Sequence, residues 1–181
     1  MKKGLVVSVL ILLLALCAIG CKSSGEKRLE NNSNIASFVA NPPTDKDYIF
    51  GVGSAKMSST SQALQASDAR ARTDISNKLN TQVQAMIIDY SRTAGTENNQ
   101  TSALTFYESV SRQLTQANLK GVEVVKREQT ADGTYWTLAR ISKTDAAQAA
   151  ADVIDNEASR YAEFKAMDAL KMMDQQLNKN Q

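Results

Sequence analysis

The chain has 181 residues, 43% of them hydrophobic and 22% charged, which is the composition of one ordinary globular domain and excludes wholesale disorder. Basic residues number 21 against 19 acidic residues, but Lys2 and Lys3 lie in an acid-free leader, so without the leader the charges balance. A balanced surface lacks the basic excess that drives binding to nucleic acid, and this excludes nucleic acid as an expected partner.

The first 20 residues predict a lipoprotein signal peptide. Met1-Lys2-Lys3 precede an apolar run from Leu5 to Ile19, which at about 15 residues is short for a helix that spans a membrane. The segment Leu16-Cys17-Ala18-Ile19-Gly20-Cys21 then resembles a bacterial lipobox, in which the thiol of Cys21 receives a diacylglyceryl group. We therefore expect lipidation at Cys21, with a simple signal peptide or an uncleaved anchor as the alternative.

Lipidation predicts a permanent attachment to a membrane, because each buried methylene contributes roughly 0.8 kcal/mol and several chains are attached. The residue after the cysteine is Lys22. In this the chain resembles lipoproteins with a non-acidic residue at that position, and the resemblance favours anchoring in the outer membrane. Cys17 leaves with the leader, so the mature chain has no disulfide and its stability must come from packing.

Residues 21–46 are predicted to form a flexible tether, because they are rich in Ser, Asn, Gly, Lys and Pro. About 25 residues of this kind have an r.m.s. reach of about 25–30 Å, which holds the domain close to the lipid surface. Three apolar residues, Ile35, Phe38 and Val39, interrupt the polar run, and we expect this patch to pack against the domain.

The segment from Tyr48 to Ser54 is aromatic and β-branched and follows a Pro-Pro turn, so it predicts a strand. It contains Gly51 and Gly53, but the sequence GVGSAKMSST has neither the third glycine of a dinucleotide fingerprint nor the Gly-Lys-Ser/Thr ending of a Walker loop. We therefore interpret the two glycines as allowing a bulge or a close approach by the following helix, and expect no nucleotide.

A long amphipathic helix is predicted from the capping candidates Ser58-Ser59-Thr60 to about Ala94. Its core stripe comprises Leu64, Ala71, Ile75, Leu79, Met86 and Tyr90. The opposite face, interpreted as solvated, carries Arg70, Arg72, Asp74, Lys78 and Gln84. After a break at residues 95–99, a second helix ending before Gly121 is marked by Leu104, Tyr107, Val110 and Leu114.

Residues 122–130 and 135–141 flank Asp132-Gly133 and predict a β-hairpin with a two-residue primed turn. This turn would place Val124 opposite Ile141 and Val125 opposite Arg140. Trp136, Leu138 and Arg127 would share one face, and apolar residues on both faces indicate that one face packs on the long helix while the other is partly covered or offers a contact patch.

A last helix is predicted from about Thr144, with Asp145 in its first turn, where the helix dipole favours an acid. Its apolar stripe changes phase near Tyr161, so we expect the chain beyond to kink, fray or pack against another chain. The predicted fold is α+β: a small antiparallel sheet, one strand plus the hairpin, packs on one long and one shorter helix in residues 47–142, and a C-terminal helix occupies 143–181.

Several motifs resemble the LPP-twenty family of bacterial lipoproteins over roughly residues 38–150. They are Asn41-Pro42-Pro43, the strand Tyr48 to Ala55, the stretch ASDARAR from Ala66 to Arg72 with Ile75-Ser76-Asn77-Lys78-Leu79, Glu108-Ser109-Val110-Ser111-Arg112, and the hairpin. The resemblance implies a compact α+β module facing the surface or the periplasm. Some relatives belong to outer-membrane structures around the flagellar motor, and others have no assigned role.

We expect no enzyme, because the chain has no His, which removes the commonest general base and the usual nucleophile pairs. Asp68 and Asp74 lie on one helix but point to different sides, and Asp68 with Arg72 forms an ordinary i,i+4 pair. No cofactor or metal site is expected.

The leading hypothesis is a membrane-anchored, non-catalytic structural or assembly component of the cell envelope, with a flagellar or other envelope machine as one setting. It would contact a protein partner or itself, which a balanced charge permits. The alternative is a surface lipoprotein that binds a lipid, glycan or host ligand beside Trp136, Tyr135 and Tyr107.

Overall fold

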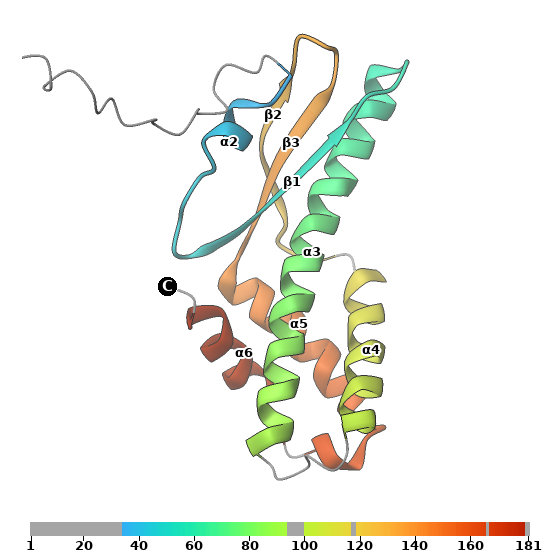
Figure 1. Cartoon of the computed structure of the whole chain (residues 1–181), viewed down its shortest axis with the longest axis vertical. Coiled ribbons are helices and arrows are strands. Elements are labelled where there is room, and N and C mark those ends of the chain that lie inside the picture. Colours follow the sequence, from blue (N-terminus) through green and yellow to red (C-terminus); the bar gives the residue numbers. More distant parts are fainter. Residues whose placement is uncertain (1–33, 94–99, 117–118, 166, 180–181) are drawn as a thin grey trace, which may run out of the picture.

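A computed structural model describes residues 34–93, 100–116, 119–165 and 167–179. The fold is α+β, as predicted, with a three-stranded antiparallel sheet at one end of the molecule and a bundle of helices at the other (Figure 1). Helix α3, Thr60–Thr93, joins the two ends, and its 34 residues span about 50 Å. The leader, Cys21 and most of the predicted tether lie outside the described residues.

The sheet has the order β1-β3-β2, so β3 is central. The strands are β1 at Tyr48–Ala55, β2 at Glu123–Gln129 and β3 at Tyr135–Ser142. Strand β1 confirms the predicted strand, and its glycines permit a close approach by α3: a Cβ added at Gly53 would overlap the carbonyl oxygen of Ser67, and one at Gly51 would overlap that of Ala71. Of the two roles proposed for these glycines, the close approach is confirmed.

The hairpin is confirmed, but its predicted turn and register are wrong. Val124 lies opposite Ala139 instead of Ile141, Gln129 lies opposite Tyr135, and a bulge shifts the register between Val124 and Lys126. Both primed two-residue turns require a positive φ at the first central residue, which would be Asp132, whereas here only Gly133 has a positive φ, of 85°. The loop is therefore a three-residue turn that ends on a left-handed glycine, and it slips the two strands relative to the prediction.

The main core lies between the inner face of the sheet and the helices. Along α3 the predicted residues Ala71, Ile75, Leu79 and Met86 are buried, while Leu64 and Tyr90 are half-buried. Helix α4, Gln100–Gln116, buries Val110 and Leu114 as its pattern indicates. It directs Phe106 into the core in place of Leu104, which is 53% exposed, so Leu104 was assigned to the wrong side of the helix.

The C-terminal segment bends instead of continuing as one helix. Helix α5, Lys143–Ala158, begins at the N-cap Ser142, whose hydroxyl accepts from the backbone N–H of Asp145 at 3.0 Å. After α5 come a 3₁₀ turn, η4, at Ala162–Phe164 and helix α6 at Ala169–Asn178, which returns against α5 and α3 (Figure 1). The change of phase thus marks a kink, the first of the three predicted outcomes.

The kink directs aromatic residues into the main core. Phe164 stacks on Phe106 with 4.2 Å between ring centroids, and Tyr161 packs edge-on against the same ring at 5.3 Å. Met173 of α6 is fully buried in the same core cluster. Residues after the bend are therefore part of the domain core.

A buried carboxylate fastens α5 to α4. Glu157 has no exposed surface and accepts hydrogen bonds from the hydroxyl of Ser109 and the amide of Gln113, both on α4. Arg160 adds an ion pair at 3.6 Å. Because each carboxylate oxygen has a donor, the charge is compensated in place and serves the packing of the two helices.

Candidate interaction surface

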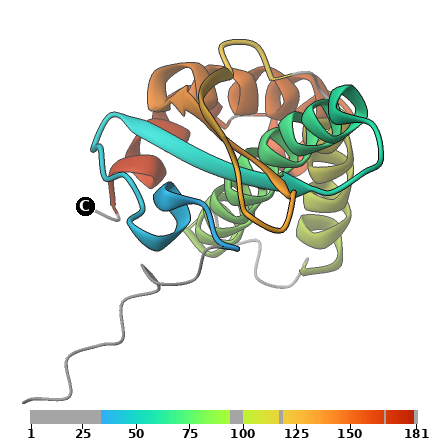
Figure 2. The same ribbon diagram turned by 90° about the horizontal axis from the view of Figure 1, so that it is seen from above.

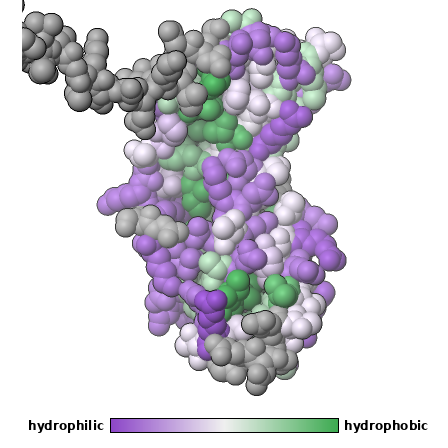
Figure 3. All heavy atoms as spheres, viewed as in Figure 1, coloured by the Kyte–Doolittle hydropathy of each residue, from purple (hydrophilic) through white to green (hydrophobic). Residues whose placement is uncertain are grey.

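The outer face of the sheet, which points away from α3, carries apolar side chains where an antiparallel sheet usually presents polar ones. Figure 3 shows this patch over the sheet end of the molecule. The outer-face cluster consists of Phe50, Val52, Trp136 and Leu138 from the sheet and Ala36, Phe38 and Val39 from the chain before it. Three of its sheet residues, Phe50, Val52 and Trp136, are only half-buried.

A single helical turn, α2 at Ser37–Ala40, lies on this face, on the opposite side of the sheet from the N-terminal half of α3 (Figure 2). Phe38 and Val39 pack in the outer-face cluster, which confirms the predicted patch for these two residues, while the third, Ile35, is half-buried and is not part of the cluster. Ser37 fastens the turn to β2: its backbone N–H donates to Glu128 Oε2 at 2.6 Å, and its hydroxyl donates to the other carboxylate oxygen. The end of the predicted tether is thus part of the folded domain.

Glu128 holds α2 as a charged acceptor. Partial burial works against its ionised form, but hydrogen bonds from Lys126 and Ser37 outweigh this and lower the pKa of the Glu128 carboxyl. The Lys126 ammonium lies 2.5 Å from Glu128 Oε1 and also donates to the Ser37 hydroxyl at 3.0 Å. Strand β2 and α2 are therefore joined by one compact polar group.

The indole of Trp136, on the outer face, has a hydrogen-bond donor without an acceptor in the described part of the chain. Its Nε1 atom is buried and has no hydrogen-bond partner among the described residues. A buried donor without an acceptor costs about 1–3 kcal/mol, which offsets part of the stability gained by burying the indole ring.

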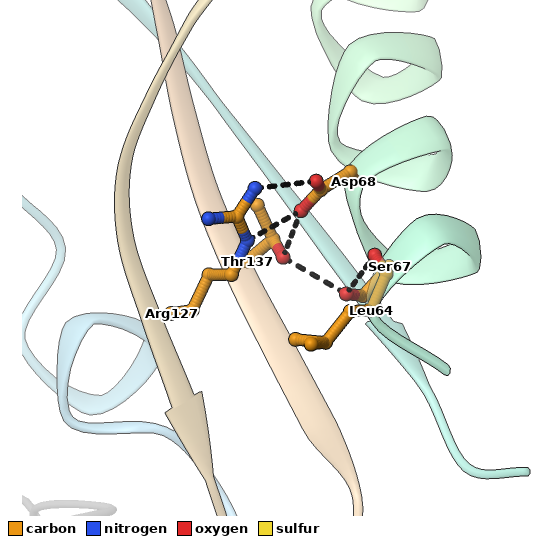
Figure 4. A network of polar contacts seen from close by, with 5 residues as sticks. All are labelled: Leu64, Ser67, Asp68, Arg127 and Thr137. Atoms are coloured by element: carbon orange, nitrogen blue, oxygen red, sulfur yellow. Dashed lines mark hydrogen bonds and ion pairs between the residues drawn. The ribbon is translucent and has the colours of Figure 1, made fainter. Parts of the chain in front are cut away.

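On the inner face a polar network fastens the sheet to α3 (Figure 4). Arg127 donates to both carboxylate oxygens of Asp68, from Nε at 3.0 Å and from Nη2 at 2.6 Å, and buried Thr137 donates to Asp68 at 2.8 Å. Ser67 Oγ lies 2.9 Å from both Thr137 Oγ1 and the Leu64 carbonyl oxygen, so its single proton bonds one of these two acceptors while Thr137 donates to Asp68. The Arg127 hydrogen bond is the main reason that the pKa of Asp68 is lowered; burial opposes it and Thr137 assists it.

Part of the α3 face that was interpreted as solvated also covers the edge of β1, although Arg70 and Lys78 on it are exposed as expected. Three of its residues, spaced four apart, bond the backbone groups that β1 directs away from β3. Lys78 Nζ donates to the Phe50 carbonyl at 2.8 Å, Asp74 accepts from the Val52 N–H at 2.9 Å, and Arg70 donates to the Ser54 carbonyl. An exposed strand edge invites pairing with another chain, so this stripe of α3 covers one edge of the sheet.

The aromatic residues of the alternative ligand site do not converge. Trp136 and Tyr135 are neighbours on β3, so their side chains point to opposite faces of the sheet. The phenol oxygen of Tyr135 lies 3.3 Å from the hydroxyl oxygen of Thr60 at the start of α3. Tyr107 packs against the main core from α4. The structure therefore contradicts a site built from these three residues.

The carboxylates named as candidates are likewise separate. Asp68 is engaged by Arg127 and Thr137, and Asp74 by the Val52 N–H and Lys78. Within the described part of the chain, no cluster of three or more potential metal ligands occurs. Nor does any helix there combine the length and apolar character needed to cross a bilayer.

The structure is thus a small α+β domain with an apolar outer sheet face, and in the sequence it follows the predicted lipidation site. The model of the LPP20 lipoprotein family matches residues 37–142, from α2 to the end of β3. The chain therefore belongs to the LPP20 lipoprotein family. No curated protein and no solved structure matches it.

Proposed function

We propose that this lipoprotein is a non-catalytic assembly component of the cell envelope, attached through lipid on Cys21 to the outer membrane, and that a flagellar or other envelope machine is its setting. The outer-face cluster carries the proposal. Half-exposed aromatic and aliphatic side chains grouped on one face are typical of protein interaction sites, whereas scattered single ones are not.

The charged groups of the domain support a non-catalytic role. Asp68, Asp74, Glu128 and Glu157 each accept hydrogen bonds from groups that hold two elements together. A general acid or base needs a carboxyl group that can exchange protons with a substrate, and these four are occupied by the fold.

The position of α2 sets how far the surface can lie from the membrane. Twelve residues separate Cys21 from Asn34, the first described residue. Even a fully extended chain of this length spans only about 45 Å. The outer-face cluster, which includes α2, is therefore held near the lipid surface, where an envelope partner would meet it.

The test compares three full-length variants in a bacterium that processes lipoproteins. Cys21→Ser is expected to move the protein out of the membrane fraction. Val52→Ser is expected to leave it in the membrane but to shift it from a large detergent-extracted complex to a small one in sedimentation. Leu104→Ser, an equally apolar change at an exposed site on α4, is the matched control and should leave the complex intact.

Each result bears on a separate part of the proposal. If Cys21→Ser stays in the membrane fraction and mass spectrometry finds no lipid on Cys21 of the unmodified protein, the anchor is wrong. If Val52→Ser and Leu104→Ser leave complexes of equal size, the outer-face cluster is not the assembly surface.

A further inference from the structure

The two edges of the sheet differ. The even-numbered residues of β1 direct their backbone groups to α3, so its odd-numbered residues bond β3. The even-numbered residues of β3 must then bond β2, where their partners are Lys126 and Glu128. Arg127 and Gln129 consequently direct their backbone N–H and C=O groups outward, and no other described strand pairs with that side of β2.

The charged side chains of β2 do not prevent strand pairing at this edge in the way that unpaired lysines would. Lys126 and Glu128 form an ion pair on the outer face, and Arg127 is neutralised by Asp68 on the inner face. Exposed edge strands repel other strands when their charges are unpaired. Here the charges are paired within the domain.

We propose that the outer edge of β2 pairs in antiparallel fashion with the same edge of a second copy, about a two-fold axis at Arg127. In this register Lys126 of one copy lies opposite Glu128 of the other, and the reverse pair is formed by symmetry. The outward backbone groups of the two Arg127 residues face each other. Their side chains also lie opposite each other on the inner face, where each is neutralised by Asp68 of its own copy.

This pairing deepens the proposed assembly role and rests on the lipid anchor. The bulge between Val124 and Lys126 limits the regular pairing to about five residues on each chain, which forms only a weak dimer in dilute solution. Anchoring confines both copies to one surface and raises their effective concentration, so a weak contact suffices there. Two outer-face clusters would then lie on one continuous six-stranded sheet.

Disulfide trapping tests the register directly. The full-length lipoprotein is reconstituted in phosphatidylethanolamine and phosphatidylglycerol vesicles as Lys126→Cys and Glu128→Cys variants that carry tags of different length. Cys21 is consumed by lipid and Cys17 is removed with the leader, so the introduced thiols are the reactive ones. Mixed vesicles should give the mixed disulfide on mild oxidation, whereas either variant alone should give several-fold less.

Leu104→Cys mixed with Lys126→Cys measures random collision, because Leu104 lies on α4 away from the sheet edge. Equal trapping in this control and in the register pair would overturn the proposal. Preferential trapping in either variant alone would overturn the register, and with it the two-fold at Arg127.

Charge reversal provides a second readout that does not depend on cysteine chemistry. Lys126→Glu or Glu128→Lys alone places like charges opposite each other twice, which is expected to weaken dimerisation on vesicles about tenfold, as measured by energy transfer between labelled copies. The double variant Lys126→Glu/Glu128→Lys restores opposite charges between the copies. It should dimerise several-fold better than Glu128→Lys, which loses the same acceptor for the Ser37 N–H and is therefore its matched reference. Equal dimerisation of these two variants, with normal far-ultraviolet circular dichroism spectra, would refute the pairing.

Failure of the anchor is distinguishable from failure of the pairing. If Cys21 is not lipidated, the protein does not bind the vesicles at all. If it binds the vesicles and the energy transfer equals that expected for random density, the anchor stands and the β2 pairing is wrong.

Discussion

Replacement of Asp68 tests whether the polar network of Figure 4 fastens the sheet to α3. The carboxylate accepts two bonds from Arg127 and one from buried Thr137, and 25% of its side chain and 47% of that of Arg127 are exposed. At this exposure the ion pair contributes about 0.5–1 kcal/mol. The buried bond to a charged acceptor contributes about 1.5 kcal/mol.

Alanine at position 68 restores about 0.5 kcal/mol of the free energy of unfolding, because its helix propensity is better than that of aspartate. The variant Asp68→Ala should therefore lower the free energy of unfolding by about 1.5–2 kcal/mol. Urea unfolding of the soluble form, with Cys21 and the leader removed, measures the change. The matched control is Asp89→Ala on the same helix, whose ion pairs with Arg92 and Lys179 are exposed, and it should cost under about 0.5 kcal/mol.

A double-mutant cycle with Arg127→Gln isolates the ion pair and should give a coupling of about 0.5–1 kcal/mol. Because the pKa of Asp68 is lowered in the folded state, its contribution is present above the ordinary value of 3.8 and is lost as the pH falls through the folded pKa. The unmodified protein should lose more stability below pH 3.8 than Asp68→Ala does. A coupling under about 0.3 kcal/mol, with equal acid sensitivity, would refute the assigned role.

Four further substitutions probe the packing by thermal and urea unfolding. Gly53→Ala should cost more than about 3 kcal/mol because its Cβ would meet backbone atoms, whereas Gly133→Ala, in open space at φ 85°, should cost about 1–2 kcal/mol; equal costs would contradict the close approach of α3. Phe164→Ala should cost about 3–5 kcal/mol through the lost stack on Phe106, and a cost under 1 kcal/mol would show that the segment after the bend is not core. Trp136→Phe should cost less than about 1 kcal/mol, since it also removes the unpaired N–H, and a loss above 2 kcal/mol would show that the indole N–H has a partner.

Periodicity predicted the elements well where a single rule decided the outcome. The core stripe of α3 follows the helical repeat, and Ala71, Ile75 and Leu79 lie where this repeat places them. The change of phase near Tyr161 also predicted a break that the structure confirms. These features depend on neighbours along the chain, which a sequence displays directly.

The hairpin register could not be predicted in the same way. Asp132-Gly133 is compatible with a two-residue primed turn and with a three-residue turn that ends on Gly133. The choice depends on how β3 must meet α3: Thr137 faces Ser67 and Asp68, and this contact fixes the position of Arg127 opposite it. A contact across about 70 residues of sequence therefore decides a local turn.

The charged stripe of α3 shows why the candidate surface was also only partly predictable. Arg70, Asp74 and Lys78 have the spacing of an ordinary solvated helix face, and in an isolated helix they would be one. They acquire another role because Gly51 and Gly53 let β1 approach so closely that its outward backbone groups come within reach of these side chains. Helix α3 thus covers the inner face and one edge of the sheet, whereas on the outer face the single turn of α2 leaves Phe50 and Val52 half-exposed.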